Sequence, residues 1–267
     1  MEERIKVDIK NGVADVKLVR ADKLNALDYA MMDALIETAE NLNKDKSVRC
    51  VVMSGEGRGF CAGLDMANFS AMASGERKKS TRNLTERTHG ITNKPQQCIW
   101  GWRELRAPVI AAVHGPALGG GFQLMLASDI RIVHPQAKMS IMESKWGLVP
   151  DMSSTPIMRY LAREDVIREL TYTARVFSGE EAKTYGFATH VSETPHEDAM
   201  KLATEIASRS PDAVQKSKAL YNALPDRTTE EALIAEAAAQ EELIGSPNQV
   251  EAVMAGMEKR EGNFTDG

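Results

Sequence analysis

Residues 108–133 read PVIAAVHGPALGGGFQLMLASDIRIV, and this stretch decides the fold. Its first part, residues 108–113, is a continuous apolar run of the kind found in strands that are buried on both faces. Three glycines at 119–121 then precede an apolar segment with helical spacing, and residues 130–133 form a second β-branched run. Strand, glycine-bearing turn, helix and strand in this order predict a parallel βαβ unit with a right-handed crossover.

The N-terminal region repeats this alternation of strands and helices. Residues 5–9 and 13–19 alternate apolar and polar side chains around Asn11-Gly12, a dipeptide that favours a two-residue hairpin turn. From Asp28, which we expect to be a helix N-cap, apolar residues recur at helical spacing. Residues 48–53 are again a continuous apolar run, which predicts a strand covered on both faces.

The C-terminal third of the chain is expected to be mostly helical. Its helical patterns lie at residues 168–173, 179–185, 197–208, 229–244 and 247–260. The composition changes near residues 193–197, which predicts a core of residues 1–195 and a helical region of residues 196–267. The expected fold class is therefore α/β, with a helical C-terminal part.

The composition limits the classes of function. The chain has 267 residues and a formal net charge of −5, from 33 lysines and arginines against 38 aspartates and glutamates. This mild acidity argues against a nucleic-acid surface, and no apolar run approaches the ~20 residues that span a bilayer. Three cysteines without a CxxC pair favour a reducing compartment and argue against a zinc site. The N-terminus is charged and unlike a signal peptide, so we expect a cytoplasmic protein. Together, these features predict a protein without metal, nucleic-acid partner or membrane contact.

Familiar nucleotide-binding and nucleophile motifs are absent from the sequence. The glycines at 55, 57 and 59 lack the spacing of a dinucleotide-binding fingerprint, and no lysine follows residues 115–121 as a P-loop requires. The five histidines form no HExxH pair, and there is no GxSxG serine elbow. The chemistry must therefore come from other side chains or from a bound organic group.

Two glycine-bearing turns follow the apparent buried strands. Residues 62–65 come after the strand at 48–53, and residues 119–121 come after the strand at 108–113. Each turn is expected to open a helix, where unpaired N–H groups point outward with the positive end of the helix dipole. Two such donors aimed at one carbonyl oxygen would form an oxyanion hole, worth ~3–4 kcal/mol per donor. The alternative is that both turns serve strand-to-helix packing alone.

Taken together, these segments resemble the crotonase (enoyl-CoA hydratase/isomerase) superfamily. In the family's order, the resemblance rests on ADKLNALDYAMMDAL at 21–35, FCAGLDM at 60–66, the stretch at 108–133, MSIMESKWGLVPDMSST at 139–155 and FSGEEA at 177–182. It implies a crotonase-like spiral of ββα turns, followed by helices that pack the chains into homotrimers, often paired as homohexamers. It also implies an acyl-CoA thioester as the substrate and no permanently bound cofactor.

The resemblance assigns roles to both glycine-bearing turns. It implies that the thioester oxygen lies between the backbone N–H groups of Leu64 and Gly120. The positions that match the segments holding CoA are Lys23, Leu24, Ala26, Ala62, Asp65, Met66 and Gly119. Residues 67–97, in which six basic and two acidic side chains give a local charge of +4, match the variable wall of the acyl pocket. Such a positive segment can also attract an anionic ligand.

The side chains at three positions bear on which reaction this site performs. Hydratases of the family carry one glutamate two residues after the triple glycine and another some twenty residues later. The first position here is Gln123, which cannot take a proton from water, and the second is Glu143. Asp151 matches a position where several isomerases and a dehalogenase carry a working aspartate. Apolar neighbours are expected to raise the pKa of Glu143 toward the working pH.

The sequence therefore predicts an enzyme that stabilises a thioester enolate and moves a double bond in enoyl- or dienoyl-CoA. Hydration of a 2-trans-enoyl-CoA, in fatty-acid or related acyl-CoA degradation, stays open as the alternative. A non-catalytic acyl-CoA-binding or RNA-binding relative is a more distant one. Purely structural roles are the alternatives for both acids. Glu143 would then be a surface carboxylate at a strand end, and Asp151 a helix cap before residues 153–160.

Overall fold

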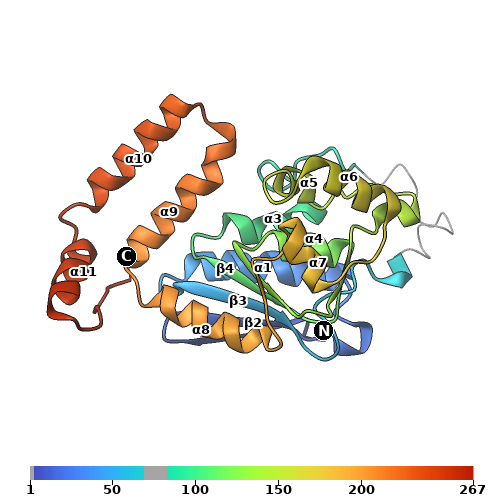
Figure 1. Cartoon of the computed structure of the whole chain (residues 1–267), viewed down its shortest axis with the longest axis horizontal. Helices are drawn as coiled ribbons and strands as arrows, with labels where there is room; N and C mark the ends of the chain where they lie inside the picture. Colours follow the sequence, from blue (N-terminus) through green and yellow to red (C-terminus); the bar gives the residue numbers. More distant parts are fainter. Residues whose placement is uncertain (1–2, 69–82, 267) are drawn as a thin grey trace.

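The computed structural model describes residues 3–68 and 83–266 (Figure 1). Its central element is a six-stranded sheet in the order β1-β2-β3-β4-β6-β8, in which only β1 and β2 are antiparallel. The strands are β1 (Ile5–Lys10), β2 (Val13–Leu18), β3 (Cys50–Gly55), β4 (Val109–Val113), β6 (Ile130–Val133) and β8 (His190–Val191). The expected hairpin and the expected parallel unit are both confirmed.

The hairpin between β1 and β2 closes through the Asn11-Gly12 dipeptide. Asn11 and Gly12 have φ angles of +51° and +79°, the backbone that a tight two-residue hairpin turn needs. The turn sets the register, so that Ile5 pairs with Leu18 and Lys10 with Val13.

A second, smaller layer of extended chain runs through the interior of the fold. Its regular part is a parallel pair, β5 (Pro116–Leu118) and β7 (Lys138–Ser140). Isolated bridges extend this layer on both sides: Leu27 to Leu64, Cys61 to Ala117 and Met139 to Phe177. Successive turns of the chain thus contribute a strand to the large sheet, an extended piece to the small layer and a helix. This arrangement is the expected spiral of ββα turns.

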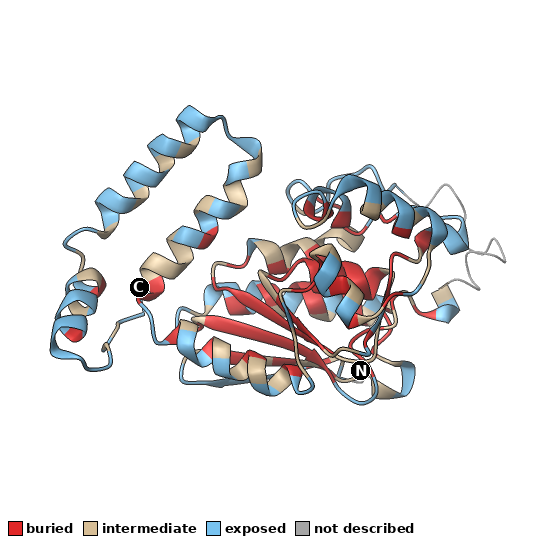
Figure 2. Ribbon diagram, viewed as in Figure 1, coloured by how far each residue is buried: buried red, intermediate tan, exposed pale blue. Residues whose placement is uncertain are grey.

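Both faces of the large sheet are covered at β3, as the apolar run at 48–53 predicted. Alternate residues of β3 point to opposite faces: Val51 and Met53 belong to the main core, while Cys50 and Val52 belong to a second cluster. The second cluster is closed by three alanines of α8 (Pro195–Ala207), which packs across the sheet (Figure 2). The chain therefore places α8 against the sheet, although its residues from 196 onward fall in the helical region expected from sequence.

Most helices lie where the sequence patterns place them. Besides α8, the described helices are α1 (Tyr29–Lys44), α3 (Lys94–Glu104), α4 (Gly120–Leu126), α5 (Ser154–Met158), α6 (Glu164–Thr173), α7 (Gly179–Tyr185), α9 (Pro211–Ala223), α10 (Thr229–Leu243) and α11 (Pro247–Glu258). Short 3-10 turns lie at Ala21–Lys23, Glu143–Trp146 and Leu224–Asp226. As expected, the Asp28 side chain caps α1 by accepting a 2.7 Å hydrogen bond from the Met31 N–H.

Among the described residues, two helices were not expected from sequence. The first, α3, begins inside the charged segment 67–97, where Asn93 and Gln96 form a capping box that specifies the helix start. The second, α9, carries only a weak apolar stripe, and polar contacts attach it to the core. Its buried Lys218 donates to the Ala107 carbonyl at 2.9 Å and lies 2.8 Å from the Asp129 carboxylate.

The helices α9, α10 and α11 extend away from the sheet as an arm (Figure 1). Most of their surface is exposed (Figure 2), including the large apolar side chains of Tyr221, Leu233, Ile234 and Met257. Across the part of the chain that the structure describes, no helix is long and apolar enough to cross a bilayer.

Candidate active site

The glycine-rich turn before α4 brings the backbone close to a carboxylate. Gly119 has a φ of +50°, and a Cβ atom there would lie only 3.2 Å from Oε1 of Glu143. A larger residue would strain the turn through this positive φ and would crowd the acid by a few tenths of an ångström, so this position favours glycine. The Gly119 N–H is used by the inner layer, where it donates to the Ser140 carbonyl at 3.0 Å.

The turn at 62–65 lies directly beside the one at 119–121. A Cβ atom on Gly63, whose φ is +85°, would lie 2.4 Å from the Leu118 carbonyl oxygen and 3.4 Å from the Gly120 nitrogen. Backbone hydrogen bonds fix Leu64 from both sides: the Leu27 N–H donates to the Gly63 carbonyl at 2.7 Å, and the Asp65 N–H donates to the Leu27 carbonyl at 3.1 Å.

Neither of the two predicted donors is used within the fold. Counting only partners in residues 3–68 and 83–266, the N–H groups of Leu64 and Gly120 donate no hydrogen bond. Two unpaired amide donors from adjacent turns make a site for an oxygen that carries negative charge. The expectation that these turns serve packing alone does not account for the unused N–H groups. The oxyanion-hole role of Leu64 and Gly120 stays a prediction.

Glu143 begins the 3-10 turn after β7 and is buried, with only 9% of its surface exposed. Its Oε1 accepts a 2.7 Å hydrogen bond from Nε2 of Gln123, whereas its Oε2 is buried and has no partner among the described residues. Burial raises the pKa of Glu143, and the charge of Asp151 raises it further, while the backbone of Glu143 and Met142 and the hydrogen bond from Gln123 oppose the shift. The interpretation of Glu143 as a surface carboxylate is therefore wrong.

Gln123 lies on α4 and is almost completely buried, at 1% exposure. Its Oε1 accepts a 2.9 Å hydrogen bond from the Met152 N–H, while its Nε2 donates to Glu143. The structure thus brings the two predicted residues into direct contact across twenty positions of sequence.

Asp151 lies in the turn before α5, next to Met152. Its side chain is exposed to solvent, yet the surrounding protein removes enough hydration to raise the pKa of its carboxyl group. Asp151 does not cap a helix, because α5 begins at Ser154 and its N-cap is Ser153, with no side-chain cap bond.

Apart from Gly119, which lies in the glycine-rich turn before α4, the residues predicted to hold CoA come from two segments that are hydrogen-bonded to each other. The Ala62 N–H donates to the Leu24 carbonyl at 2.9 Å, which joins the two predicted CoA segments. The other members of these two segments flank this contact; of them, Lys23 and Met66 are exposed whereas Ala26 and Asp65 are buried.

Sequence reasoning missed Arg20, which fastens these segments. Its guanidinium donates to the Ala26 carbonyl at 3.1 Å and to the Asp65 carboxylate. Asp65 also accepts a 2.8 Å hydrogen bond from the Ala67 N–H, and these contacts lower its pKa. Because Arg20 and Asp65 are 45 positions apart, no local pattern could have revealed their pairing.

The charged segment 67–97 is only partly described. Residues 69–82, which include four of its six basic side chains, lie outside the described residues, so this part of the expected acyl-pocket wall lies outside them too. The two described basic residues are both engaged locally: Arg87 donates to the Leu84 and Ile91 carbonyls, and Lys94 pairs with Asp33.

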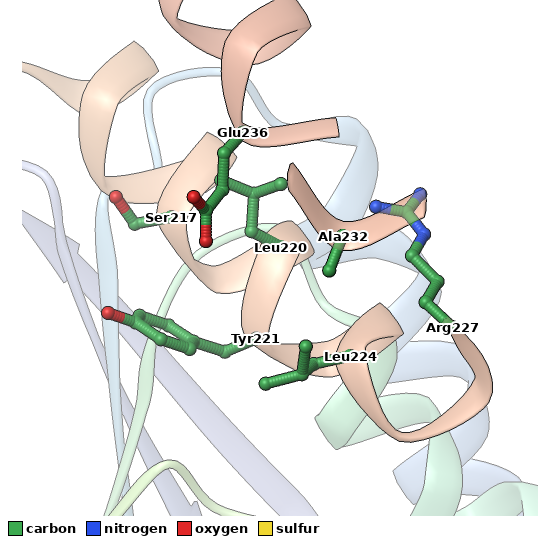
Figure 3. Close-up of a pocket in the computed structure, with 7 residues that line it drawn as sticks. All are labelled: Ser217, Leu220, Tyr221, Leu224, Arg227, Ala232 and Glu236. Atoms are coloured by element: carbon green, nitrogen blue, oxygen red, sulfur yellow. The ribbon is translucent and has the colours of Figure 1, made fainter. Parts of the chain in front are cut away.

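A separate hollow lies between α9 and α10 (Figure 3). Its lining consists of Ser217, Leu220, Tyr221, Leu224, Arg227, Ala232 and Glu236. No predicted site residue belongs to this set, so the hollow is distinct from the candidate active site. In the described residues, no group of three or more His, Cys, Asp or Glu side chains is arranged to hold a metal ion.

Comparison with known proteins identifies the family. The family model for enoyl-CoA hydratase/isomerase matches residues 8–267, so the chain belongs to that family and is an enzyme of it. It is 27% identical over 264 residues to the mitochondrial Delta(3,5)-Delta(2,4)-dienoyl-CoA isomerase of Dictyostelium discoideum, covering 98% of this chain and 90% of that protein. It is 31% identical over 256 residues to the mitochondrial methylglutaconyl-CoA hydratase of Mus musculus, covering 93% of this chain and 78% of that protein.

Solved structures of enzymes described as enoyl-CoA hydratases have the same fold as this chain. The crystal structure of an enoyl-CoA hydratase from Bacillus anthracis superimposes with a TM-score of 0.87 at 28% identity, covering 99% of this chain and 100% of that one. Relatives at this level of identity include both an isomerase and hydratases. The particular reaction must therefore be argued from the side chains of this chain.

Proposed function

We propose that this enzyme moves a double bond in an enoyl-CoA or dienoyl-CoA thioester. The observation that carries the proposal is the composition of the acid–base site: Glu143 is buried beside the unpaired N–H groups, and position 123 holds an amide. Adding water calls for a group at position 123 that can take a proton from water, and an amide cannot do so. Moving a double bond needs only a carboxylate that takes a proton and returns it elsewhere.

The reaction proceeds through an enolate of the thioester. The thioester oxygen accepts hydrogen bonds from the N–H groups of Leu64 and Gly120, and Glu143 removes a proton from carbon. As that C–H bond breaks, its electron pair spreads along the conjugated chain to the thioester oxygen. Delivery of a proton to the other end of this chain forms a new C–H bond and leaves the double bond displaced, with no atoms gained or lost.

Asp151 serves as the second acid–base group when the two ends of the conjugated system lie too far apart for one carboxylate. Its raised pKa and its solvent access support this role, because a group that exchanges protons with water can supply the returning proton.

In this proposal CoA enters the site as part of the thioester substrate, and no permanently bound cofactor is needed. The joined segments around Leu24 and Ala62 hold the CoA portion, with Lys23 exposed at their edge to meet its phosphates. Gly119 keeps the acyl group close to Glu143.

Hydration of a 2-trans-enoyl-CoA is the second candidate. Similarity to proteins named methylglutaconyl-CoA hydratase and enoyl-CoA hydratase favours it. A non-catalytic acyl-CoA-binding protein is less well supported, because a buried carboxylate with an unpartnered oxygen costs stability without aiding binding.

The arm supports assembly into a homotrimer or homohexamer. Its exposed apolar side chains, among them Leu233, Ile234 and Met257, need a partner surface, and a second copy of this chain is the proposed partner. Light scattering on purified protein tests this. A cytoplasmic location stays a prediction, whereas the relatives named above from Dictyostelium and mouse are mitochondrial.

Single substitutions test the assigned chemistry. Glu143→Gln is expected to lower the isomerisation kcat for 3-enoyl- and 3,5-dienoyl-CoA by about 10²- to 10⁴-fold, the usual contribution of a general base. Glu164→Gln makes the same change on the exposed surface of α6 and serves as the control. Unchanged isomerisation in Glu143→Gln would remove the basis of the proposal.

A further inference from the structure

The amide of Gln123 is held at both ends. Its Oε1 accepts from the Met152 N–H at 2.9 Å, and its Nε2 donates to Oε1 of Glu143 at 2.7 Å. All three residues are buried, with exposures of 1% for Gln123, 7% for Met152 and 9% for Glu143. These contacts are therefore shielded from competing water.

The chemistry of the two neighbours fixes the orientation of this amide. Turning it by half a rotation would place the NH₂ group against the Met152 N–H, so that two donors face each other. The same turn would place the carbonyl oxygen of Gln123 against the Glu143 carboxylate, so that two acceptors face each other. Buried polar groups left without partners are costly, so only one orientation is stable.

The two oxygens of Glu143 are consequently unequal. Oε1 is engaged by the Gln123 amide, whereas Oε2 is buried and has no partner among the described residues. An unpartnered carboxylate oxygen in a buried place is exceptional in folded proteins and calls for an explanation. A substrate atom that meets Oε2 supplies one.

We propose that Gln123 is a positioning residue, which holds Glu143 by Oε1 and presents Oε2 as the atom that takes and returns the proton. This inference rests on the proposed function, because it concerns the same acid–base group. It explains why an amide suits position 123: a carboxylate there would place a second anion against Oε1, and the two acids would compete for one proton.

The clamp also influences how readily Glu143 ionises. Burial is the largest influence and raises the pKa of Glu143, as does the nearby charge of Asp151, whereas the Gln123 hydrogen bond and the neighbouring backbone favour the charged form and lower the pKa. Removal of the amide therefore has two effects that can be measured separately: Oε2 loses its fixed position, and Glu143 binds its proton more tightly.

The test compares Gln123→Met with Gln215→Met. Methionine nearly preserves the volume of glutamine and removes both polar contacts. Gln215 lies on α9, where its side chain accepts one hydrogen bond from Arg106 at 3.1 Å, so its replacement is a matched control away from the site. The measurements are kcat, KM and the pH dependence of kcat/KM for isomerisation, together with thermal unfolding.

A positioning role predicts that Gln123→Met lowers kcat on the order of 100-fold with little change in KM. The acidic limb of its pH profile also moves to higher pH, while Gln215→Met leaves kcat and the profile unchanged. If Gln123→Met lowers the unfolding temperature but leaves kcat within threefold and the acidic limb in place, the proposal is wrong.

A second measurement tests the positioning role of Gln123 independently of the proposed isomerase function. If the wild type isomerises no enoyl thioester, the proposed function fails, and ¹³C NMR titration of the Glu143 carboxyl still tests the clamp. A titration midpoint that is higher in Gln123→Met than in the wild type supports it, and an unchanged midpoint overturns it.

Discussion

Replacing Gly63 with alanine would test whether the turns at 62–65 and 119–121 act as one oxyanion hole. Gly63 has a φ of +85°, and a left-handed backbone costs an alanine roughly 1–2 kcal/mol. In addition, its Cβ atom would lie 2.4 Å from the Leu118 carbonyl oxygen and 3.4 Å from the Gly120 nitrogen. The substitution therefore forces apart the two segments that carry the proposed donors.

The size of this effect follows from the contact. A Cβ atom essentially never approaches another atom within 3.0 Å, so the Leu118 carbonyl must retreat by roughly 0.6 Å or more. Because Leu118 is two residues before Gly120, the movement displaces the Gly120 N–H relative to that of Leu64. Loss of one correctly placed donor costs ~3–4 kcal/mol of transition-state stabilisation, which corresponds to ~10²–10³ in kcat.

The assay is steady-state isomerisation of a 3-enoyl-CoA, with Gly245→Ala as the control. Gly245 has a similar φ of +77°, and a Cβ atom there would meet nothing within 4 Å. The control thus bears the backbone strain without the collision, and only Gly63→Ala should lose activity. If both variants fold and their kcat values agree within threefold, the two turns do not form an oxyanion hole.

Three further predictions concern the side chains around the site. Since the pKa of Glu143 is raised in the folded state, folding stability falls as the pH rises from the ordinary glutamate pKa through the raised one. Glu143→Gln should therefore be more stable than the wild type at pH 8, by about 1–2 kcal/mol, with a smaller gain at pH 5; equal denaturation midpoints at pH 8 would contradict this. Arg20→Gln leaves the buried Asp65 carboxylate without its paired guanidinium and should lower the free energy of unfolding by roughly 3–5 kcal/mol. Adding Asp65→Asn should recover part of this loss. If urea unfolding shows that the two substitutions act additively, the pairing does not contribute to stability. Gln123→Glu supplies the missing carboxylate and should raise hydration of a 2-trans-enoyl-CoA, whereas no gain would leave the role given to position 123 unsupported.

The elements with strong local signals could be predicted from the sequence. The Asn11-Gly12 hairpin, the Asp28 cap and the apolar strand β3 all follow from neighbouring residues, and the structure confirms them. By contrast, α9 has only a weak apolar stripe, and its position depends on the contact of Lys218 with Asp129 and the Ala107 carbonyl. Such long-range contacts leave no periodic trace in the sequence.

The sequence could name the residues of the candidate site but not the geometry in which they lie. Gln123 and Glu143 are twenty positions apart in the sequence. Their contact depends on the small inner layer, in which β5 and β7 pair in parallel. The partner of the Gln123 oxygen is the backbone N–H of Met152, a group that every residue except proline possesses. Sequence patterns therefore cannot identify it.

We propose that this acid–base site moves double bonds in preference to adding water. The most direct measurement is kcat/KM for isomerisation of a 3-enoyl- or 3,5-dienoyl-CoA beside kcat/KM for hydration of a 2-trans-enoyl-CoA, in one preparation of the wild type. We predict that isomerisation is faster and that Glu143→Gln lowers its kcat by about 10²- to 10⁴-fold. Faster hydration that survives Glu143→Gln would contradict the account.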